Sequence, residues 1–276
     1  MWDLFDQLGG YMKSSIEVKD LKVAYDQNII IPSLNLAIPK GKITMIIGSN
    51  GCGKSTLLKA IARMLKPSSG EISLNGSLIK EQASREIAKK MAVLPQSPTA
   101  PAGLLVKELV GYGRFPYLSP MGGLKKHDLE IIDWAMKSTG VYDLRERHVE
   151  SLSGGQRQRV WIAMALAQET EILVLDEPTT YLDMAHQLEI LQLLKKLNRE
   201  NNTTIVMVLH ELNNACKFAD HIIGLKQGNL VFEGAPKDVI IEENLKELYQ
   251  IQAILKMNED NTYPICVDFE LVQDIE

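Results

Sequence analysis

The stretch that decides the fold is 152–183, which reads Leu152-Ser-Gly-Gly-Gln156, an apolar run to Ala167, Ile172-Leu-Val-Leu-Asp-Glu-Pro178 and Tyr181-Leu-Asp183. The first five residues lead into a helix-like run, and the N–H donors and partial positive charge at a helix start suit a phosphate. The short β-leaning run 172–175 predicts a buried parallel strand. It ends in Asp176 and Glu177, which the following loop can turn toward one crevice. We therefore predict a phosphate-binding helix start and a metal-and-base site.

A second motif supplies a phosphate site of its own. Residues 42–47 read as a buried strand, and this strand runs into Gly48-Ser-Asn-Gly-Cys-Gly-Lys-Ser-Thr56, the P-loop pattern Gly-x-x-x-x-Gly-Lys-Ser. Glycines let such a loop wrap phosphates with backbone N–H groups, Lys54 reaches the outer phosphates, and the Ser55 hydroxyl can hold Mg²⁺. An apolar face at Leu57, Leu58, Ile61 and Leu65 predicts the helix that must follow. The context that a P-loop requires is therefore present.

Composition argues against several classes of protein. The net charge of −5 and the short, scattered basic clusters argue against a general nucleic-acid binder. The longest apolar run, 160–167, is far shorter than the ~20 residues of a membrane helix, and residues 1–12 do not resemble a secretion signal. Cys52, Cys216 and Cys266 match no zinc pattern, so we expect reduced thiols in a cytosolic protein.

The rest of the chain predicts an α/β core with two additions. Residues 97–150 are punctuated by Pro and Gly and show no strand pattern, which indicates an inserted helical subdomain. Alternation and apolar runs predict strands near 16–23, 34–38, 71–75, 92–96, 203–209, 221–225 and 230–233. Helices are expected at 106–110, 128–137, 186–198, 236–241 and 242–256, and a tail strand at 265–271 is expected at a sheet edge. We expect an N-terminal extension (1–13), a core (14–96 and 151–240), a helical subdomain (97–150) and a C-terminal extension (241–276).

The order of the motifs carries a family resemblance. The chain closely resembles an ATP-binding cassette (ABC) ATPase from about residue 16 to 234. The motifs that carry this resemblance are, in order, the P-loop, Gln96, Leu152-Ser-Gly-Gly-Gln156, the Asp176–Glu177 pair and His210. The resemblance implies a P-loop NTPase (RecA-like) core with an N-terminal antiparallel β subdomain and an inserted α-helical subdomain. Residues 109–116 and 176–187 look like the importers of iron–siderophore, haem and vitamin B12.

The resemblance also implies a role for each matching residue. Tyr25 would stack on adenine, and the phosphates would be held by Gly48, Ser49, Asn50, Gly51, Cys52, Gly53, Lys54, Ser55 and Thr56. Mg²⁺ would be held by Ser55, Gln96 and Asp176. Catalysis would use Glu177 as the general base, together with His210, Gln96 and Lys54. A capping or packing role for His210 stays open. Ser153, Gly154, Gly155 and Gln156 would complete the nucleotide site of a second copy, and Asp183 would lie on the loop that crosses between the copies.

Partners follow from the same resemblance. It implies ATP and Mg²⁺ as cofactors, a homodimer, two integral membrane permease subunits, an extracytoplasmic substrate-binding protein as an indirect partner, and no nucleic acid. The expected location is the cytoplasmic face of the cell membrane, as a peripheral protein. A groove near Gln96 and residues 104–118 is expected to receive a permease helix. Alternatives are a cassette ATPase for another metal importer or an exporter, a soluble cassette acting on DNA or ribosomes, and an unrelated P-loop kinase or GTPase.

Overall fold

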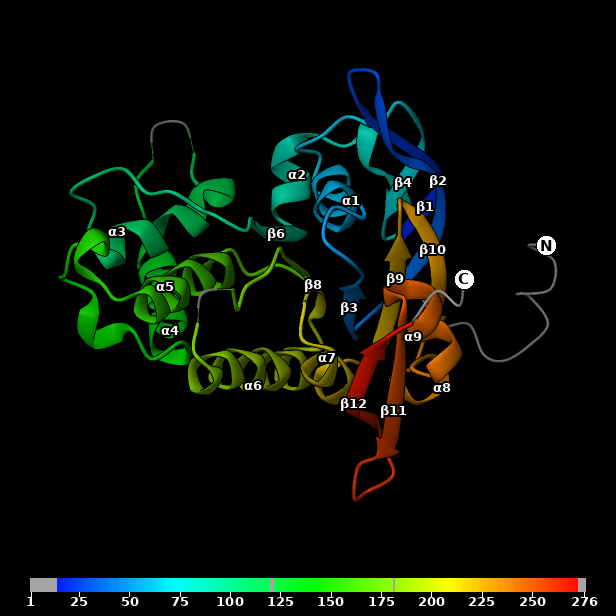
Figure 1. Ribbon diagram of the computed structural model, residues 1–276. Coiled ribbons are helices and arrows are strands. Elements are labelled where there is room, and N and C mark those ends of the chain that lie inside the picture. Colours follow the sequence, from blue (N-terminus) through cyan, green and yellow to red (C-terminus); the bar gives the residue numbers. More distant parts are fainter. Residues whose placement is uncertain (1–13, 120–121, 181, 273–276) are drawn as a thin grey trace.

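The computed structural model describes residues 14–119, 122–180 and 182–272, so the extension expected at 1–13 lies outside the described residues. Within these ranges a six-stranded sheet has the order β10-β9-β3-β8-β7-β6, and a four-stranded antiparallel sheet has the order β2-β1-β4-β5 (Figure 1). The large sheet contains β3 (Ile43–Ile47), β6 (Met91–Leu94), β7 (Ile172–Leu175), β8 (Thr204–Val208), β9 (His221–Lys226) and β10 (Asn229–Gly234). The smaller contains β1 (Ser14–Tyr25), β2 (Asn28–Pro39), β4 (Ser69–Leu74) and β5 (Ser77–Leu78). The expected α/β class with an N-terminal antiparallel β subdomain is confirmed.

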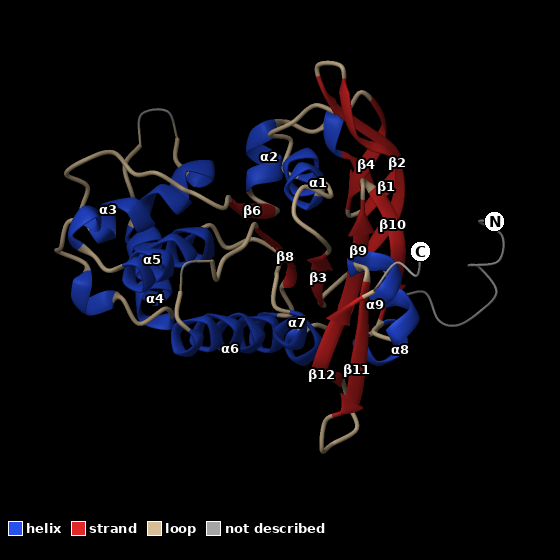
Figure 2. Ribbon diagram, in the orientation of Figure 1, coloured by secondary structure: helices blue, strands red, loops and turns tan. Residues whose placement is uncertain are grey.

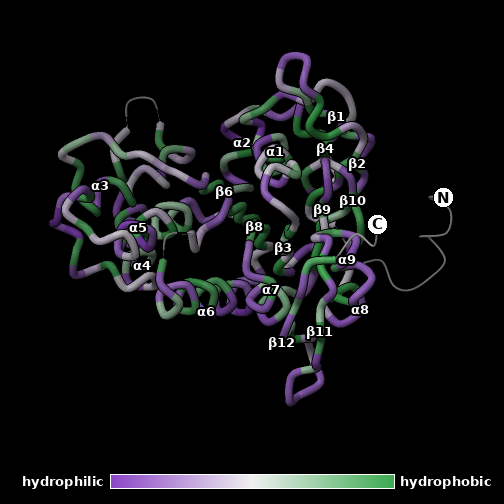
Figure 3. The backbone as a smooth tube through the Cα atoms, viewed as in Figure 1, coloured by the Kyte–Doolittle hydropathy of each residue, from purple (hydrophilic) through white to green (hydrophobic). Residues whose placement is uncertain are grey.

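The parallel strands of the large sheet bring the motifs to one edge. β3, β7 and β8 are buried at every residue, as parallel strands covered on both faces are, and Figure 3 shows the apolar character of β3 and β8. β3 pairs in parallel with β8 and β9, and β7 pairs in parallel with β6 and β8. Because carboxyl ends of parallel strands meet at one edge, the segments that follow β3, β6, β7 and β8 lie together.

Helices cover the sheet and form a separate group beside it (Figure 2). The helices around the sheets are α1 (Lys54–Ile61), α2 (Ser84–Ala88), α6 (Met184–Asn201), α7 (Leu212–Phe218), α8 (Pro236–Val239), α9 (Glu242–Tyr249) and the 3-10 helix η1 (Ile79–Glu81). The group beside it holds α3 (Val106–Gly111), α4 (Lys126–Ser138), α5 (Gly154–Ala167) and the 3-10 helices η2 (Tyr112–Tyr117), η3 (Tyr142–Leu144) and η4 (Val149–Ser151). α5 packs on α3 and α4. We propose residues 97–150 as the inserted helical subdomain. α5 follows this segment in the chain and packs on its helices.

Of two expectations for the C-terminal part, one is wrong and one is confirmed. The helix expected over 242–256 ends at Tyr249, because Gln250 has a left-handed φ of 60°, and β11 (Ile251–Met257) follows. The expected edge strand at 265–271 is present as β12 (Pro264–Leu271), which pairs with β11 in a separate two-stranded sheet. Burial alternates along the first residues of β11, with Ala253 buried between exposed neighbours. This period of two is that of a strand, and pairing with β12 satisfies its backbone.

Arg114 lies at the buried centre of the helical group. Its guanidinium donates to Asp128 Oδ1 at 2.9 Å, to Glu169 Oε2 at 2.8 Å and to the Ala167 carbonyl at 2.8 Å, and it lies over the Tyr117 ring. These partners come from α4, from the end of α5 and from the residues after it. One buried cation therefore joins η2 to both longer helices.

We expect Arg114→Ala to lower the free energy of unfolding by about 3–5 kcal/mol, because it leaves the buried Asp128 carboxylate without its counter-ion. Urea denaturation of the full chain measures the loss. The control is Lys126→Ala, which removes a cation with 92% of its side chain exposed and should change stability by less than about 0.5 kcal/mol. Equal effects of the two substitutions would contradict the central role of Arg114.

Candidate functional site

The P-loop joins β3 to α1 and depends on glycine conformations. Gly48 and Gly53 have φ of 147° and 105°, which residues with a side chain rarely adopt. A Cβ on Gly48 would lie 2.1 Å from the carbonyl oxygen of Leu225 on β9. The N-cap of α1 is Gly53, which has no side chain to cap the first N–H groups of the helix. The loop therefore offers backbone donors to an anion.

Lys54 places its ammonium inside this loop. The residue is buried, and its Nζ donates to the carbonyls of Gly48 and Ser49 at 2.9 and 2.8 Å. Nζ also lies 3.9 Å from the Cys52 Sγ, but burial raises the pKa of that thiol, so it stays neutral. The loop thus holds a cation whose present partners are neutral carbonyls. Phosphate oxygens could replace them with stronger, charge-assisted contacts.

Ser55 and Asp176 form a pair of oxygen ligands. Ser55 Oγ donates to Asp176 Oδ1 at 2.9 Å, and Asp176 is 6% exposed. Burial raises the pKa of Asp176, the hydrogen bond from Ser55 opposes this, and the nearby charge of Glu177 adds to it. A bound cation would offset both the burial of the Asp176 carboxylate and the repulsion from Glu177. Hydroxyl and carboxylate oxygens are also the ligands that Mg²⁺ prefers. The donor set therefore fits Mg²⁺.

Glu177 is the centre of a network built from three strand ends. It has a left-handed φ of 51° and is the second residue after β7. Its carboxylate accepts hydrogen bonds from Gln96 Nε2 at 2.7 Å and Thr180 Oγ1 at 2.9 Å, and His210 Nε2 lies 2.7 Å from Oε1. Burial alone would raise the pKa of Glu177, but the contacts from His210, Thr180 and Gln96 hold it below its ordinary value. The carboxylate is therefore ionised at neutral pH and fixed in orientation.

The glycine-rich helix start of the opening stretch is ordered by its own side chains. Ser153 caps α5: its Oγ accepts from the Gln156 N–H at 3.3 Å, and Gln156 Oε1 accepts from the Ser153 N–H at 3.2 Å. Asp183 caps α6 in the same way by accepting from the His186 N–H at 3.0 Å. A Cβ on Gly155 would lie 3.3 Å from the His186 ring, so the two helix starts lie side by side.

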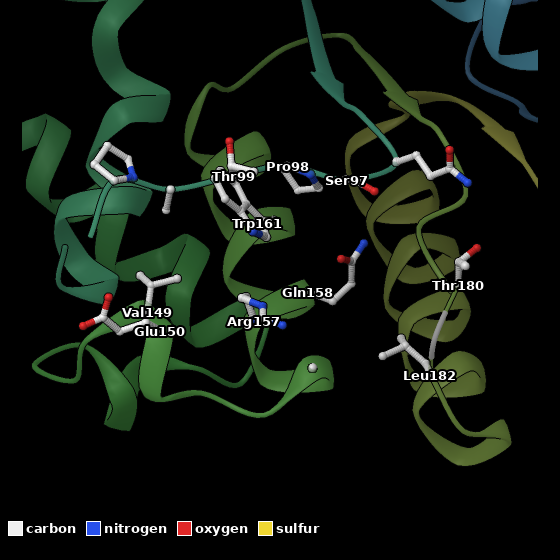
Figure 4. A pocket seen from close by; sticks show the side chains of 14 residues that line it. Ser97, Pro98, Thr99, Val149, Glu150, Arg157, Gln158, Trp161, Thr180 and Leu182 are labelled. Carbon is white, nitrogen blue, oxygen red and sulfur yellow. The ribbon is translucent and has the colours of Figure 1, made fainter. Parts of the chain in front are cut away.

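A cleft of about 400 Å³ lies between this helix start and Gln96 (Figure 4). Residues 96–101, Gly154 and Trp161 of α5, and Thr180 line it. In the described part of the chain, no hydrogen bond joins residues 153–156 to the P-loop. One chain therefore brings together the P-loop, Asp176, Glu177, Gln96 and His210. The helix start at Ser153 to Gln156 lies across the cleft from Gln96, beside the start of α6 at Asp183.

Tyr25 stands at the end of β1 with 42% of its surface exposed. The next strand of the hairpin brings Ile30 and Ile31 to the P-loop, since a Cβ on Gly53 would lie 3.4 and 3.6 Å from their side chains. The hairpin therefore contacts the P-loop through residues that lie close in sequence to the exposed ring of Tyr25.

Thr180 was not expected from the sequence. Its only signal was a hydroxyl three residues after Glu177.

Comparison with known proteins places this geometry in a family. A profile of the family described as ABC transporter matches residues 31–180. The iron(3+)-hydroxamate import ATP-binding protein FhuC of Bacillus subtilis (strain 168) is 50% identical over 261 residues, which cover 95% of this chain and 97% of that protein. A structure described as a metal-chelate type ABC transporter in an inward-facing conformation matches with a TM-score of 0.79 and 29% identity, over 93% of this chain and 98% of that one.

A further solved structure is the ATP-binding cassette MJ0796, a dimer in a post-hydrolysis state with ADP and Pi. It matches with a TM-score of 0.70 and 30% identity, over 80% of this chain and 98% of that chain. The expected P-loop NTPase fold is thereby confirmed, and a kinase or GTPase unrelated to cassettes is excluded. The chain belongs to the ABC transporter family, as an ATP-binding cassette that hydrolyses ATP.

Proposed function

We propose that this chain powers the import of ferric siderophores through a membrane permease by hydrolysing ATP. The observation that carries the proposal is 50% identity over nearly the whole length of a protein named for iron(3+)-hydroxamate import. The neighbour described as a metal-chelate type transporter supports the same cargo class. The alternative is a cassette that serves another metal importer or an exporter, because the residues of the ATPase site bind the nucleotide and do not contact the transported molecule.

The residues of the site are proposed to have different roles in ATP hydrolysis. Ser55, Asp176 and Gln96 would hold Mg²⁺, which when bound supplies positive charge against the phosphates. Lys54 and the loop N–H groups bind the phosphate oxygens. Glu177, ionised and held by Thr180 and Gln96, accepts the proton of the attacking water, while His210 contacts the γ-phosphate end of the site. Tyr25 stacks on the adenine. Catalysis then rests on positioning and charge rather than on a covalent step.

We propose that two copies complete each other's sites. Ser153, Gly154 and Gly155 form a helix start that, among the described residues, makes no hydrogen bond to the P-loop of its own chain. A head-to-tail partner would place this start against the phosphates in the first chain's P-loop, with Asp183 near the contact. The MJ0796 cassette is a dimer, which supports this assembly.

The complete assembly would add two permease subunits and, on the outside, a substrate-binding protein. None of the helices among the described residues is long and apolar enough to cross a membrane. We propose that the chain lies peripherally at the cytoplasmic face of the membrane. The docking surface proposed for a permease helix combines the cleft at residues 96–101 with the exposed rings of Tyr112 and Phe115, whose centroids lie 4.7 Å apart.

Lys54→Ala tests this function. In cells that lack their own hydroxamate-import ATPase, the unaltered chain should restore growth on ferric hydroxamate under iron limitation, and Lys54→Ala should not. The purified variant should bind ATP at least about 100-fold more weakly, because the ammonium that meets the outer phosphates is lost. Radiolabelled iron uptake and ATP titration measure the two effects.

The matched control is Lys66→Ala, which removes an exposed lysine shortly after the same helix and should support normal growth. Unchanged ATP binding by Lys54→Ala would contradict the P-loop role. Normal ATP hydrolysis by the unaltered chain without any iron uptake would contradict the siderophore cargo and leave the cassette function standing.

A further inference from the structure

His186, the third residue of α6, takes no part in the proposed hydrolysis, but it lies between two segments that are expected to reach a second copy. One is Asp183, the N-cap residue of α6, and the other is the glycine-rich helix start of α5. Core packing does not hold the ring in place, since 49% of the His186 side chain is exposed. Its position is set instead by specific contacts with these two neighbours.

The first contact joins the ring to Asp183. His186 Nδ1 lies 2.8 Å from Asp183 Oδ1, and the same oxygen accepts from the His186 backbone N–H at 3.0 Å. The backbone N–H and the side chain of His186 hold the pKa of the Asp183 carboxyl below its ordinary value, so the carboxylate is ionised at neutral pH. The ring therefore fixes the direction of the Asp183 carboxylate. Removing the ring would leave the backbone hydrogen bond, and with it the helix cap, in place.

The second contact joins the ring to the start of α5. A Cβ on Gly155 would lie 3.3 Å from Cδ2 and 3.6 Å from Cγ of His186, so the ring packs closely on the glycine backbone. Outside α5 and its N-cap residue, no described residue comes within 4 Å of a Cβ on Gly154. The ring therefore contacts one particular glycine of the helix start and leaves its neighbour open.

The contact between Gly155 and His186 connects two parts of the chain. α5 packs on the inserted helices α3 and α4, whereas α6 contacts β8 and α7 of the core, and Figure 1 shows α6 running toward α7. One turn farther along both helices, Arg159 of α5 and Glu189 of α6 form an ion pair. His186 thus lies at the outer end of the seam that joins the helical group to the core.

This seam matters because the two copies must complete both sites at once. In a two-fold head-to-tail pair, each chain gives its helix start to the partner's P-loop and receives the partner's helix start at its own P-loop. Both contacts close together only if the helix start keeps one position relative to the P-loop of the same chain. A helix start that moved freely would lose that freedom on closing, and this loss weakens association.

We propose that His186 is a positioning residue that holds the glycine-rich helix start and Asp183 in one fixed arrangement for contact with the nucleotide of a second copy. It acts through Gly155 and Asp183 and does not touch the nucleotide itself. The inference rests on the proposed assembly of two copies.

The test uses the full chain with Glu177→Gln, in which ATP should hold two copies together. Adding His186→Ala should raise the dissociation constant of the ATP-bound dimer about tenfold, because a hydrogen bond and a packing contact are both lost. Analytical ultracentrifugation over a range of chain concentrations measures this constant. ATP binding, titrated at chain concentrations too low for dimers, should stay within about twofold because the P-loop is unaltered.

Two further variants separate the two contacts. His186→Asn keeps a hydrogen-bond donor near Asp183 and removes the ring, whereas His186→Phe keeps a ring against Gly155 and removes the donor. Each should raise the dimer dissociation constant about threefold, less than His186→Ala does. Full recovery by either variant would overturn the proposal, because a single contact would then be enough.

The matched control is His127→Ala, which removes an exposed histidine of α4 that lies near Ala165 and Leu166 at the other end of α5. Its dimer should be as tight as that of Glu177→Gln alone. Thermal unfolding of every variant should change little, because Asp183 still caps α6.

An equally tight dimer with His186→Ala would overturn the proposal. A weaker dimer that came with a matching loss of thermal stability or of ATP binding to the single chain would also overturn it, because the role of His186 would then be purely structural. A Glu177→Gln chain that forms no dimer with ATP although His186 is intact would instead overturn the proposed assembly itself.

Discussion

Replacing Glu177 with glutamine should reduce ATP hydrolysis at least about 100-fold while ATP binding stays within a few-fold of the unaltered chain. The amide keeps the size of the side chain but cannot accept the proton of the attacking water. Lys54, Ser55 and Asp176, which we assign to the nucleotide and the metal, are left in place. Phosphate release measures the first effect, and titration with a fluorescent ATP analogue measures the second.

The same variant should reveal the assembly. ATP that is bound but not cleaved keeps the charge that bridges two copies, so size exclusion with ATP should give about twice the 30.8 kDa of one chain. The matched control is Glu171→Gln at the opposite end of β7, where the carboxylate is 60% exposed and pairs with Lys40. It should hydrolyse ATP normally and show no trapped dimer. A Glu177→Gln chain that hydrolyses ATP normally and stays monomeric would remove Glu177 from the role of base.

The meeting of Glu177, Gln96 and His210 could be predicted because each follows a strand of apolar, β-leaning residues. Parallel strands put their carboxyl ends at one edge, which is why the three residues meet. From the sequence, however, Gln96 and His210 were assigned to the site by the order of the motifs, that is, by the family resemblance. The P-loop was equally predictable, since its glycines and its flanking strand and helix are local features. The catalytic and binding roles assigned to these residues remain predictions.

Contacts that depend on tertiary packing could not be predicted. In 242–256, Leu248, Ile251 and Leu255 recur at the spacing of a helix face, and only pairing with β12 shows that the second half is a strand. The contact between Asn213 and Cys266 joins residues 53 positions apart, with no sequence signal beyond two polar groups. Thr180 was overlooked for a related reason, because its role depends on the left-handed turn at Glu177.

Ser153→Arg should prevent the ATP-bound dimer from forming while the P-loop of each chain still binds ATP normally. In the proposed assembly the N–H groups at the start of α5 must come within hydrogen-bond distance of the partner's phosphates, about 3 Å. A long arginine side chain at the N-cap position would keep the two surfaces apart. Introduced together with Glu177→Gln, it should turn the trapped dimer back into a monomer on size exclusion. ATP titration should show one nucleotide bound to each chain.

Ser153→Ala is the matched control, because it removes the cap to Gln156 at a cost of about 1 kcal/mol but adds no bulk, so the dimer should still form. A second arm mixes Ser153→Arg with Lys54→Ala. Each mixed dimer then contains one site with an intact P-loop and an intact partner helix start, and a second site with both defects. Hydrolysis should therefore stay below that of the unaltered chain at any mixing ratio. Full recovery in the mixture, or an ATP-bound dimer of the Ser153→Arg chain, would mean that the glycine-rich helix start does not serve the partner's nucleotide.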